Sequence, residues 1–182
     1  MEGLFRARGN MARVHAVKSK YDRGDFTSPL SDCRDPLVVG GVLKLYLSSL
    51  PEPLLTYNLF KSFLAVPNIP TINRQLHTLR TLLCQVPEAN RATVQVVLPV
   101  MARQAEGSER ELRQVGAVMA PVFLRRRPMD HLPGAAAHAQ ELEAVNTVLR
   151  LLILHCQTIL SPSPNAPGLV ESPVNAPQRH RP

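Results

Sequence analysis

One apolar stretch, residues 35–56, organises the pattern of the chain, with the sequence DPLVVGGVLKLYLSSLPEPLLT. Asp35 and Pro36 are typical of a helix N-cap and first helical position. Pro51 and Pro53 are typical of a helix end, because a proline disfavours helical geometry in the residue before it. Apolar residues occupy nearly every side between these limits, so the pattern predicts a helix over residues 36–50 in the middle of a bundle.

The rest of the chain alternates between segments with helical spacing of apolar residues and short loops rich in proline, glycine or polar residues. No segment has a convincing strand period, so we expect an all-α protein. The predicted helices cover residues 10–21, with Asn10 as cap; 56–65, with Thr56 as cap; a helix from Thr71 or Asn73; one entered through the turn at residues 87–90 and kinked at Pro99; one from Ser108 that Pro121 ends; and 141–160, after a loop at residues 126–138.

The length of 182 residues suits one domain with a hydrophobic core. We expect a single-domain helical bundle over residues 1–160. Residues 161–182 hold six of the seventeen prolines and few apolar residues, so they predict a disordered Pro-rich tail. Pro164 and Pro167 form a PxxP motif, a candidate SH3 ligand, although a plain disordered tail explains the same composition.

The formal net charge of +7 suits an acidic partner. Its arginines are dispersed except at residues 125–127, and aromatic residues that could stack on bases are few, so nucleic-acid binding is not expected. Cys33, Cys84 and Cys156 lack a CxxC pairing, which favours reduced thiols in the cytosol over disulfides or zinc. No apolar run long enough for a membrane span and no signal peptide are visible. Together these features predict a cytoplasmic protein.

The sequence offers no convincing catalytic set of its own. The six histidines have no cysteine or carboxylate at metal-ligand or triad spacing, and there is no P-loop. We therefore expect no cofactor or metal and no enzyme in the ordinary sense. A role in catalysis would instead require lending a group to another protein's active site, as an arginine does in phosphoryl transfer.

Six blocks carry a resemblance to a known family. They are EGLFRARGN (residues 2–10), YDRGD (21–25), residues 35–56, YNLFKSFL (57–64), VPEANRATV (86–94) and VGAVMAPVFLR (115–125). In this order the blocks resemble Rho-family GTPase-activating (RhoGAP) domains, from about residue 2 to residue 127. The resemblance implies a helical bundle of the RhoGAP type. Family members carry a helix before the first block, so we expect an N-terminally truncated domain lacking its first helix.

The resemblance also implies site residues. Arg6 occupies the position of the family's arginine finger, and Lys44 that of the lysine that braces the finger loop and touches the GTPase. Ser48 replaces an arginine that faces the GTPase. Val122 replaces an asparagine that hydrogen-bonds to the partner's switch, and valine cannot donate that bond. Taken alone, Arg6 could be an ordinary solvated loop arginine, and Lys44 a lysine that extends from a core helix to solvent.

The sequence therefore predicts an activator that stimulates GTP hydrolysis by a GTP-bound Rho-family small GTPase through Arg6. The truncation and the substitutions at Ser48 and Val122 are expected to weaken it. The alternative is a non-catalytic RhoGAP-like module that binds a small GTPase or another signalling protein. A third reading is an arginine-rich helical adaptor that works through its Pro-rich tail.

Overall fold

The computed structural model describes Leu4 and residues 9–27, 29–131 and 133–161. Within these residues the backbone forms eight α-helices and two short 3-10 helices and contains no strand. The all-α prediction is thus confirmed. The helices are α1 (Met11–Asp22), η1 (Leu30–Asp32), α2 (Pro36–Ser48), α3 (Phe60–Ala65), η2 (Val66–Asn68), α4 (Ile72–Gln85), α5 (Glu88–Ala105), α6 (Glu109–Phe123), α7 (Ala135–Leu154) and α8 (Cys156–Leu160).

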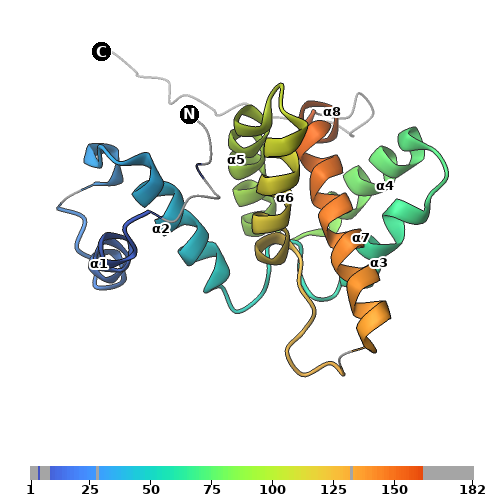
Figure 1. Ribbon diagram of the computed structural model, residues 1–182, viewed down its shortest axis with the longest axis horizontal. Coiled ribbons are helices and arrows are strands. Elements are labelled where there is room, and N and C mark those ends of the chain that lie inside the picture. The colour runs from blue at the N-terminus through green and yellow to red at the C-terminus, as the bar shows by residue number, and fades with distance from the viewer. Residues whose placement is uncertain (1–3, 5–8, 28, 132, 162–182) are drawn as a thin grey trace, which may run out of the picture.

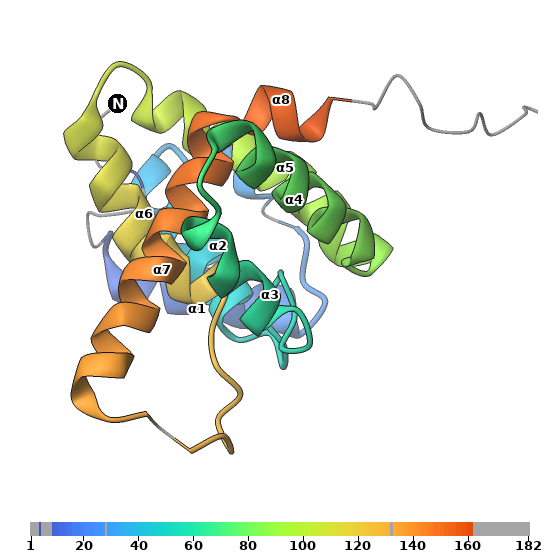
Figure 2. The same cartoon turned by 90° about the vertical axis from the view of Figure 1, so that its right-hand side faces the viewer.

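Helices α6 and α7 pack side by side in the middle of the molecule (Figures 1 and 2). Helix α5 packs against both of them, and α3 and α4 lie on the side opposite α2 (Figure 1). Helices α1 and α2 form a separate pair at the other end of the long axis. This arrangement places α2 beside α6 rather than at the centre.

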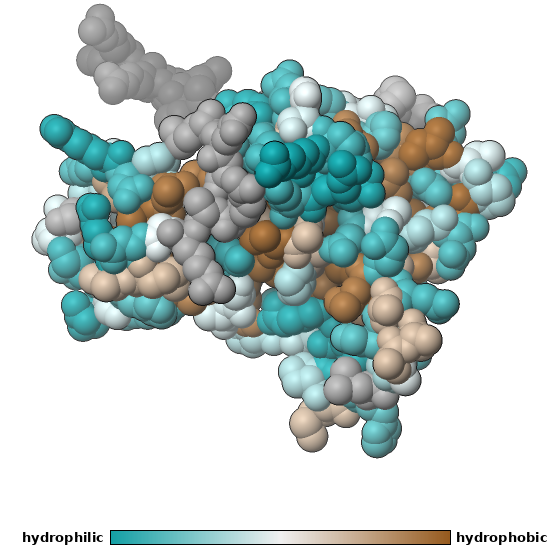
Figure 3. All heavy atoms as spheres, viewed as in Figure 1, coloured by the Kyte–Doolittle hydropathy of each residue, from teal (hydrophilic) through white to brown (hydrophobic). Residues whose placement is uncertain are grey.

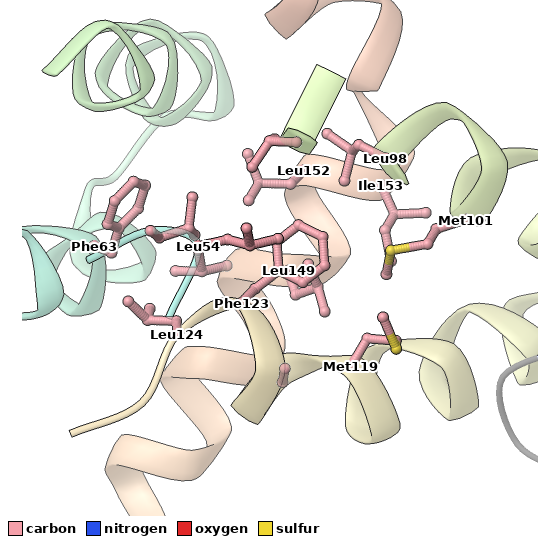
Figure 4. Close-up of a cluster of buried hydrophobic side chains, with 14 of the residues drawn as sticks. Leu54, Phe63, Leu98, Met101, Met119, Phe123, Leu124, Leu149, Leu152 and Ile153 are labelled. Carbon is pink, nitrogen blue, oxygen red and sulfur yellow. The ribbon is translucent and has the colours of Figure 1, made fainter. Parts of the chain in front are cut away.

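The main core lies between these central helices and the segment that follows α2. Its side chains converge from several elements, as Figure 4 shows. Removing such large apolar side chains from water is the main favourable term in folding. Labelled members of the cluster, all buried, are Leu54, Phe63, Leu98, Met101, Met119, Phe123, Leu124, Leu149, Leu152 and Ile153.

The predicted central position of residues 36–50 is wrong. Leu47 is the one residue of α2 fully buried in the main core, whereas Val38 and Val42 pack against Val14 of α1 in a second, smaller cluster. Tyr46 is 54% exposed. Helix α2 is apolar on most sides because one side packs against α1 and another against the main core. A helix that packs on two sides in this way has the same sequence pattern as a fully enclosed helix.

Three predicted helix caps are confirmed. The side chain of Asn10 accepts a hydrogen bond from the N–H of Arg13 (3.1 Å). Asp35 accepts from Leu37 (3.0 Å) and Ser108 from Glu111 (3.2 Å). Each bond satisfies a backbone donor that the first helical turn leaves free.

Several predicted boundaries are wrong. Thr56 does not cap a helix: its φ of 63° is in the left-handed region, and α3 begins only at Phe60. Pro121 lies inside α6, which continues to Phe123. The proline lacks a backbone donor, but the N–H of Leu124 still bonds to the carbonyl oxygen of Ala120 (2.9 Å) and closes the last turn. Helix α7 begins at Ala135, six residues before the predicted start.

The C-terminal end of α8 is held by a side chain from α4. Nη2 of Arg80 donates to the carbonyl oxygens of Thr158 (2.7 Å) and Ser161 (2.8 Å). A cation is favourable at this position because the last carbonyls of a helix carry partial negative charge. The predicted tail over residues 162–182 lies outside the described residues. None of the helices in the described part of the chain is long and apolar enough to cross a membrane.

Candidate partner-binding surface

Lys44 and Ser48 lie one turn apart on α2 and therefore share a face of that helix. Lys44 is half-buried and Ser48 is exposed. The Lys44 ammonium makes no ion pair or hydrogen bond with the residues that the structure describes. The described contacts therefore leave its charge available to a partner.

The segments on either side of the predicted finger lie against the same helix. A Cβ atom on Gly40 would meet the carbonyl oxygen of Leu4 at 2.9 Å, and one on Gly9 would meet the carbonyl oxygen of Leu37 at 2.8 Å. Only glycine permits backbones to approach so closely. Arg6 itself lies outside the described residues.

A third glycine sets the distance between α1 and α2. A Cβ atom on Gly41 would lie 2.8 Å from Cγ2 of Val14, so the two helices are in close contact at this point. Apolar residues are visible at the surface in the region of α2, among hydrophilic ones, in the space-filling view of the same face (Figure 3). The N-terminal half of α2 thus contacts both the chain at Leu4 and Gly9 and helix α1.

Val122 lies near the end of α6, which packs against α2. Its side chain is 3% exposed and belongs to the main core. The structure therefore brings Lys44 and Ser48 together on one face, whereas Val122 offers almost no side-chain surface to a partner.

The segment that follows α2 is tied to the end of α6 by polar groups that sequence reasoning did not assign. Arg125 donates to the carbonyl oxygen of Leu50 (2.7 Å), and the N–H of Leu55 donates to the carbonyl oxygen of Phe123 (2.9 Å). Asn90 of α5 donates to Leu54 (3.1 Å). Asn90 and Arg125 both stand in the blocks that carry the family resemblance, which was the available signal for them.

Among the described residues, no group of three or more histidine, cysteine or acidic side chains is arranged to hold a metal ion. In the loop after α1, the Thr27 hydroxyl and backbone N–H donate to Asp25 and hold the pKa of this exposed carboxyl below its usual value. This effect stabilises the loop and is lost as the pH falls through that lowered pKa.

The described residues form an all-helical bundle that carries Lys44 and Ser48 on one face of α2. The comparison with known families identifies it: the RhoGAP domain model matches residues 1–128. The chain belongs to the RhoGAP domain family.

Curated relatives agree with this assignment. The chain is 33% identical over 173 residues to human Rho GTPase-activating protein 40, and the aligned part covers 88% of this chain and 24% of that protein. It is 29% identical over 160 residues to Rho GTPase-activating protein 92B of Drosophila melanogaster, covering 84% of this chain and 22% of that protein. The chain thus spans less than a quarter of the length of these two relatives.

The fold resembles that of two solved structures. The crystal structure of human Rho GTPase activating protein 15 matches with a TM-score of 0.75 and 22% identity, over 88% of this chain and 76% of that one. The BH domain from GRAF, the GTPase regulator associated with focal adhesion kinase, matches with a TM-score of 0.71 and 24% identity, over 87% and 83%.

Proposed function

We propose that this chain stimulates GTP hydrolysis by a Rho-family small GTPase, with Arg6 as the arginine finger and with Lys44 and Ser48 at the contact. It acts on the active site of its GTP-bound partner and is a regulator rather than an enzyme. Its place of action is the cytoplasm, where Rho-family GTPases act.

The observation that carries this proposal is the close approach of both flanks of Arg6 to α2. Leu4 lies against Gly40, and Lys44 is one helical turn further along α2. Leu4, two residues before Arg6 in the sequence, thus lies against the same helix that carries Lys44.

The chemistry of the proposed step needs both groups. In phosphoryl transfer, negative charge spreads over the oxygens of the γ-phosphate, and a guanidinium matches two of them with paired donors. Lys44 supplies a second positive charge that attracts the acidic surface of a nucleotide-bound partner. Arg6 thus acts on the rate of hydrolysis, whereas Lys44 acts on binding.

The test is single-turnover GTP hydrolysis by Rho and Rac proteins with the full chain, Arg6→Ala and Arg8→Ala. Arg8 stands two residues further along the same loop, where the family usually has serine, and serves as the matched control. Arg6→Ala is expected to abolish stimulation without changing affinity for the GTP-bound partner, because a finger contributes mainly in the transition state. Equal stimulation by wild type and Arg6→Ala would refute the finger.

A non-catalytic binding module is the second candidate function. Buried Val122 and the short, uncharged Ser48 favour it, because they stand in place of the asparagine and the arginine with which the family contacts the GTPase. This candidate predicts binding of the GTP-bound protein with no acceleration of hydrolysis, by wild type and by Arg6→Ala alike. Binding of an SH3 domain through Pro164 and Pro167 is a separate proposal, and a peptide of residues 161–182 is its direct probe.

A further inference from the structure

The chain is extended as it leaves α6, and successive side chains point in opposite directions. Leu124 has φ −146° and ψ 115°, and in extended backbone alternate residues share a side. Arg125 and Arg127 both reach the ring of Tyr57, with guanidinium carbons 5.9 Å and 5.4 Å from its centroid. Arg126 turns the other way, towards Phe60.

The Tyr57 ring that holds these two arginines is itself fixed. Its hydroxyl donates to the carbonyl oxygen of Pro51 (3.1 Å), and its backbone N–H donates to Oε1 of Glu52 (2.8 Å). An aromatic face attracts a cation placed within about 6 Å of its centroid. Tyr57 therefore keeps both guanidinium groups beside the segment that follows α2.

These two positive charges have no counterion among the described residues. Arg126 is paired with Glu141, and the Glu52 carboxylate accepts from Tyr57. Arg125 uses one nitrogen on the carbonyl oxygen of Leu50, whereas the guanidinium of the exposed Arg127 forms no ion pair or hydrogen bond with the described part of the chain. Like charges gathered on one ring repel each other, so an anion bound between them lowers the energy of the arrangement.

Arg125 and Arg127 lie close to the face of α2 that carries Lys44 and Ser48. Leu50, which accepts from Arg125, is two residues beyond Ser48, so it lies within roughly 7 Å of it along the chain. Helix α2 also packs against α6, whose end leads into Arg125. Positive groups thus continue from α2 onto the segment after α6.

We propose that Arg125 and Arg127, held on Tyr57, bind a carboxylate on the surface of the GTPase partner. A planar guanidinium presents paired donors that match the two oxygens of a carboxylate. A partner seated on Lys44 and Ser48 brings its own surface to this place, which favours a protein carboxylate over a lipid phosphate. The inference rests on the proposed function, because it extends the same contact surface.

The experiment measures the affinity and association rate of the full chain for Rho and Rac loaded with a non-hydrolysable GTP analogue. The variants are Arg127→Glu, Arg127→Gln and, as matched control, Arg74→Glu. Arg127 is chosen because it is exposed and its guanidinium contacts the Tyr57 ring without an ion pair or hydrogen bond to a described residue. Arg74 is an exposed arginine on α4, at the opposite end of the molecule from α2 (Figure 1).

Arg127→Glu is expected to weaken binding about three- to tenfold, mainly through the association rate, as charge changes at the rim of an interface do. The affinity of Arg127→Gln is expected to lie between those of Arg127→Glu and wild type. The affinities of both variants should depend less on salt than that of wild type. Arg74→Glu is expected to change binding less than about twofold. If wild type binds the GTPase and the affinity of Arg127→Glu equals that of Arg74→Glu, the inference is overturned and the proposed function is left standing.

Two further outcomes separate the remaining explanations. If wild type binds neither GTPase, the proposed function fails and the inference falls with it. Vesicles containing phosphatidylserine are the second probe. If Arg127→Glu loses vesicle binding but keeps full GTPase binding, the anion is a lipid phosphate and the inference is overturned.

Discussion

The carbonyl oxygen of Leu4 lies 2.9 Å from the point that a Cβ atom on Gly40 would occupy. Real Cβ contacts are longer, and the atom met is backbone, so an added methyl group must displace the segment that carries Leu4. This glycine therefore couples the surface of α2 to the residue that stands two positions before Arg6 in the sequence.

Gly40→Ala is expected to reduce stimulation of GTP hydrolysis while leaving the melting temperature nearly unchanged. Alanine gains about 1 kcal/mol of helix propensity over glycine, which offsets part of the steric cost. Single-turnover hydrolysis and thermal unfolding together test this. The control is Gly116→Ala in α6, where the added atom would meet Cγ of the flexible Arg150 side chain at 3.2 Å. Equal stimulation by Gly40→Ala and wild type would show that the position of Leu4 is irrelevant to activity.

Val122→Asn is expected to destabilise the protein by roughly 2 to 3 kcal/mol, because the site is 3% exposed and a buried amide without partners is costly. From the sequence alone, this change restores a residue expected to hydrogen-bond to the GTPase. Burial reverses that expectation. Thermal unfolding should show a melting temperature lower by about 4 to 12 °C, and an unchanged value would mean that position 122 reaches solvent or a partner.

Ser48→Arg is expected to strengthen binding of a GTP-bound Rho-family protein about three- to tenfold. The residue is exposed and one turn from Lys44, so the new guanidinium extends the existing positive face. Stability should stay within about 0.5 kcal/mol of wild type, as for most surface changes. Thr81→Arg adds the same charge at an exposed position of α4 and should leave affinity unchanged. Equal gains from both variants would indicate a general effect of net charge.

Local chemistry explains which parts of this structure could be predicted from the sequence. The caps at Asn10, Asp35 and Ser108 depend on residues two or three positions away, so the chain itself contains the whole interaction. The shared face of Lys44 and Ser48 follows from helical periodicity alone. The spacing of Ser108 and Glu111 also fits a capping box, in which Glu111 would accept from the N–H of Ser108. That N–H donates to the carbonyl oxygen of Ala105 (3.2 Å) instead.

Tertiary contacts explain what could not be predicted. The left-handed turn at Thr56 directly follows two residues bonded to distant groups, Leu54 to Asn90 and Leu55 to Phe123. The burial of Val122 depends on how α6 packs, and the edge position of α2 depends on how its apolar residues are divided between two clusters. Neither is encoded in a local pattern. The arginines on Tyr57 were missed because the ring and the guanidinium groups are about 70 residues apart in the chain.

The ion pair between Arg126 and Glu141 predicts a measurable contribution to stability. Two nitrogens of Arg126 donate to the two oxygens of Glu141, and their side chains are 25% and 23% exposed. The pair joins the segment after α6 to the first half of α7. Because both groups are largely removed from water, losing one charge leaves the other poorly solvated, which costs more than breaking an exposed pair.

Glu141→Gln is therefore expected to destabilise the protein by about 1 to 2 kcal/mol in urea unfolding. Hydrogen exchange should accelerate first in the N-terminal half of α7, which this pair anchors. Asp22→Asn is the matched control: it removes a carboxylate that is 57% exposed and paired with Lys18 within α1 (2.6 Å), and should cost no more than about 0.5 kcal/mol. Equal losses from the two variants, or faster exchange throughout the protein, would show that the Arg126–Glu141 pair does not anchor α7.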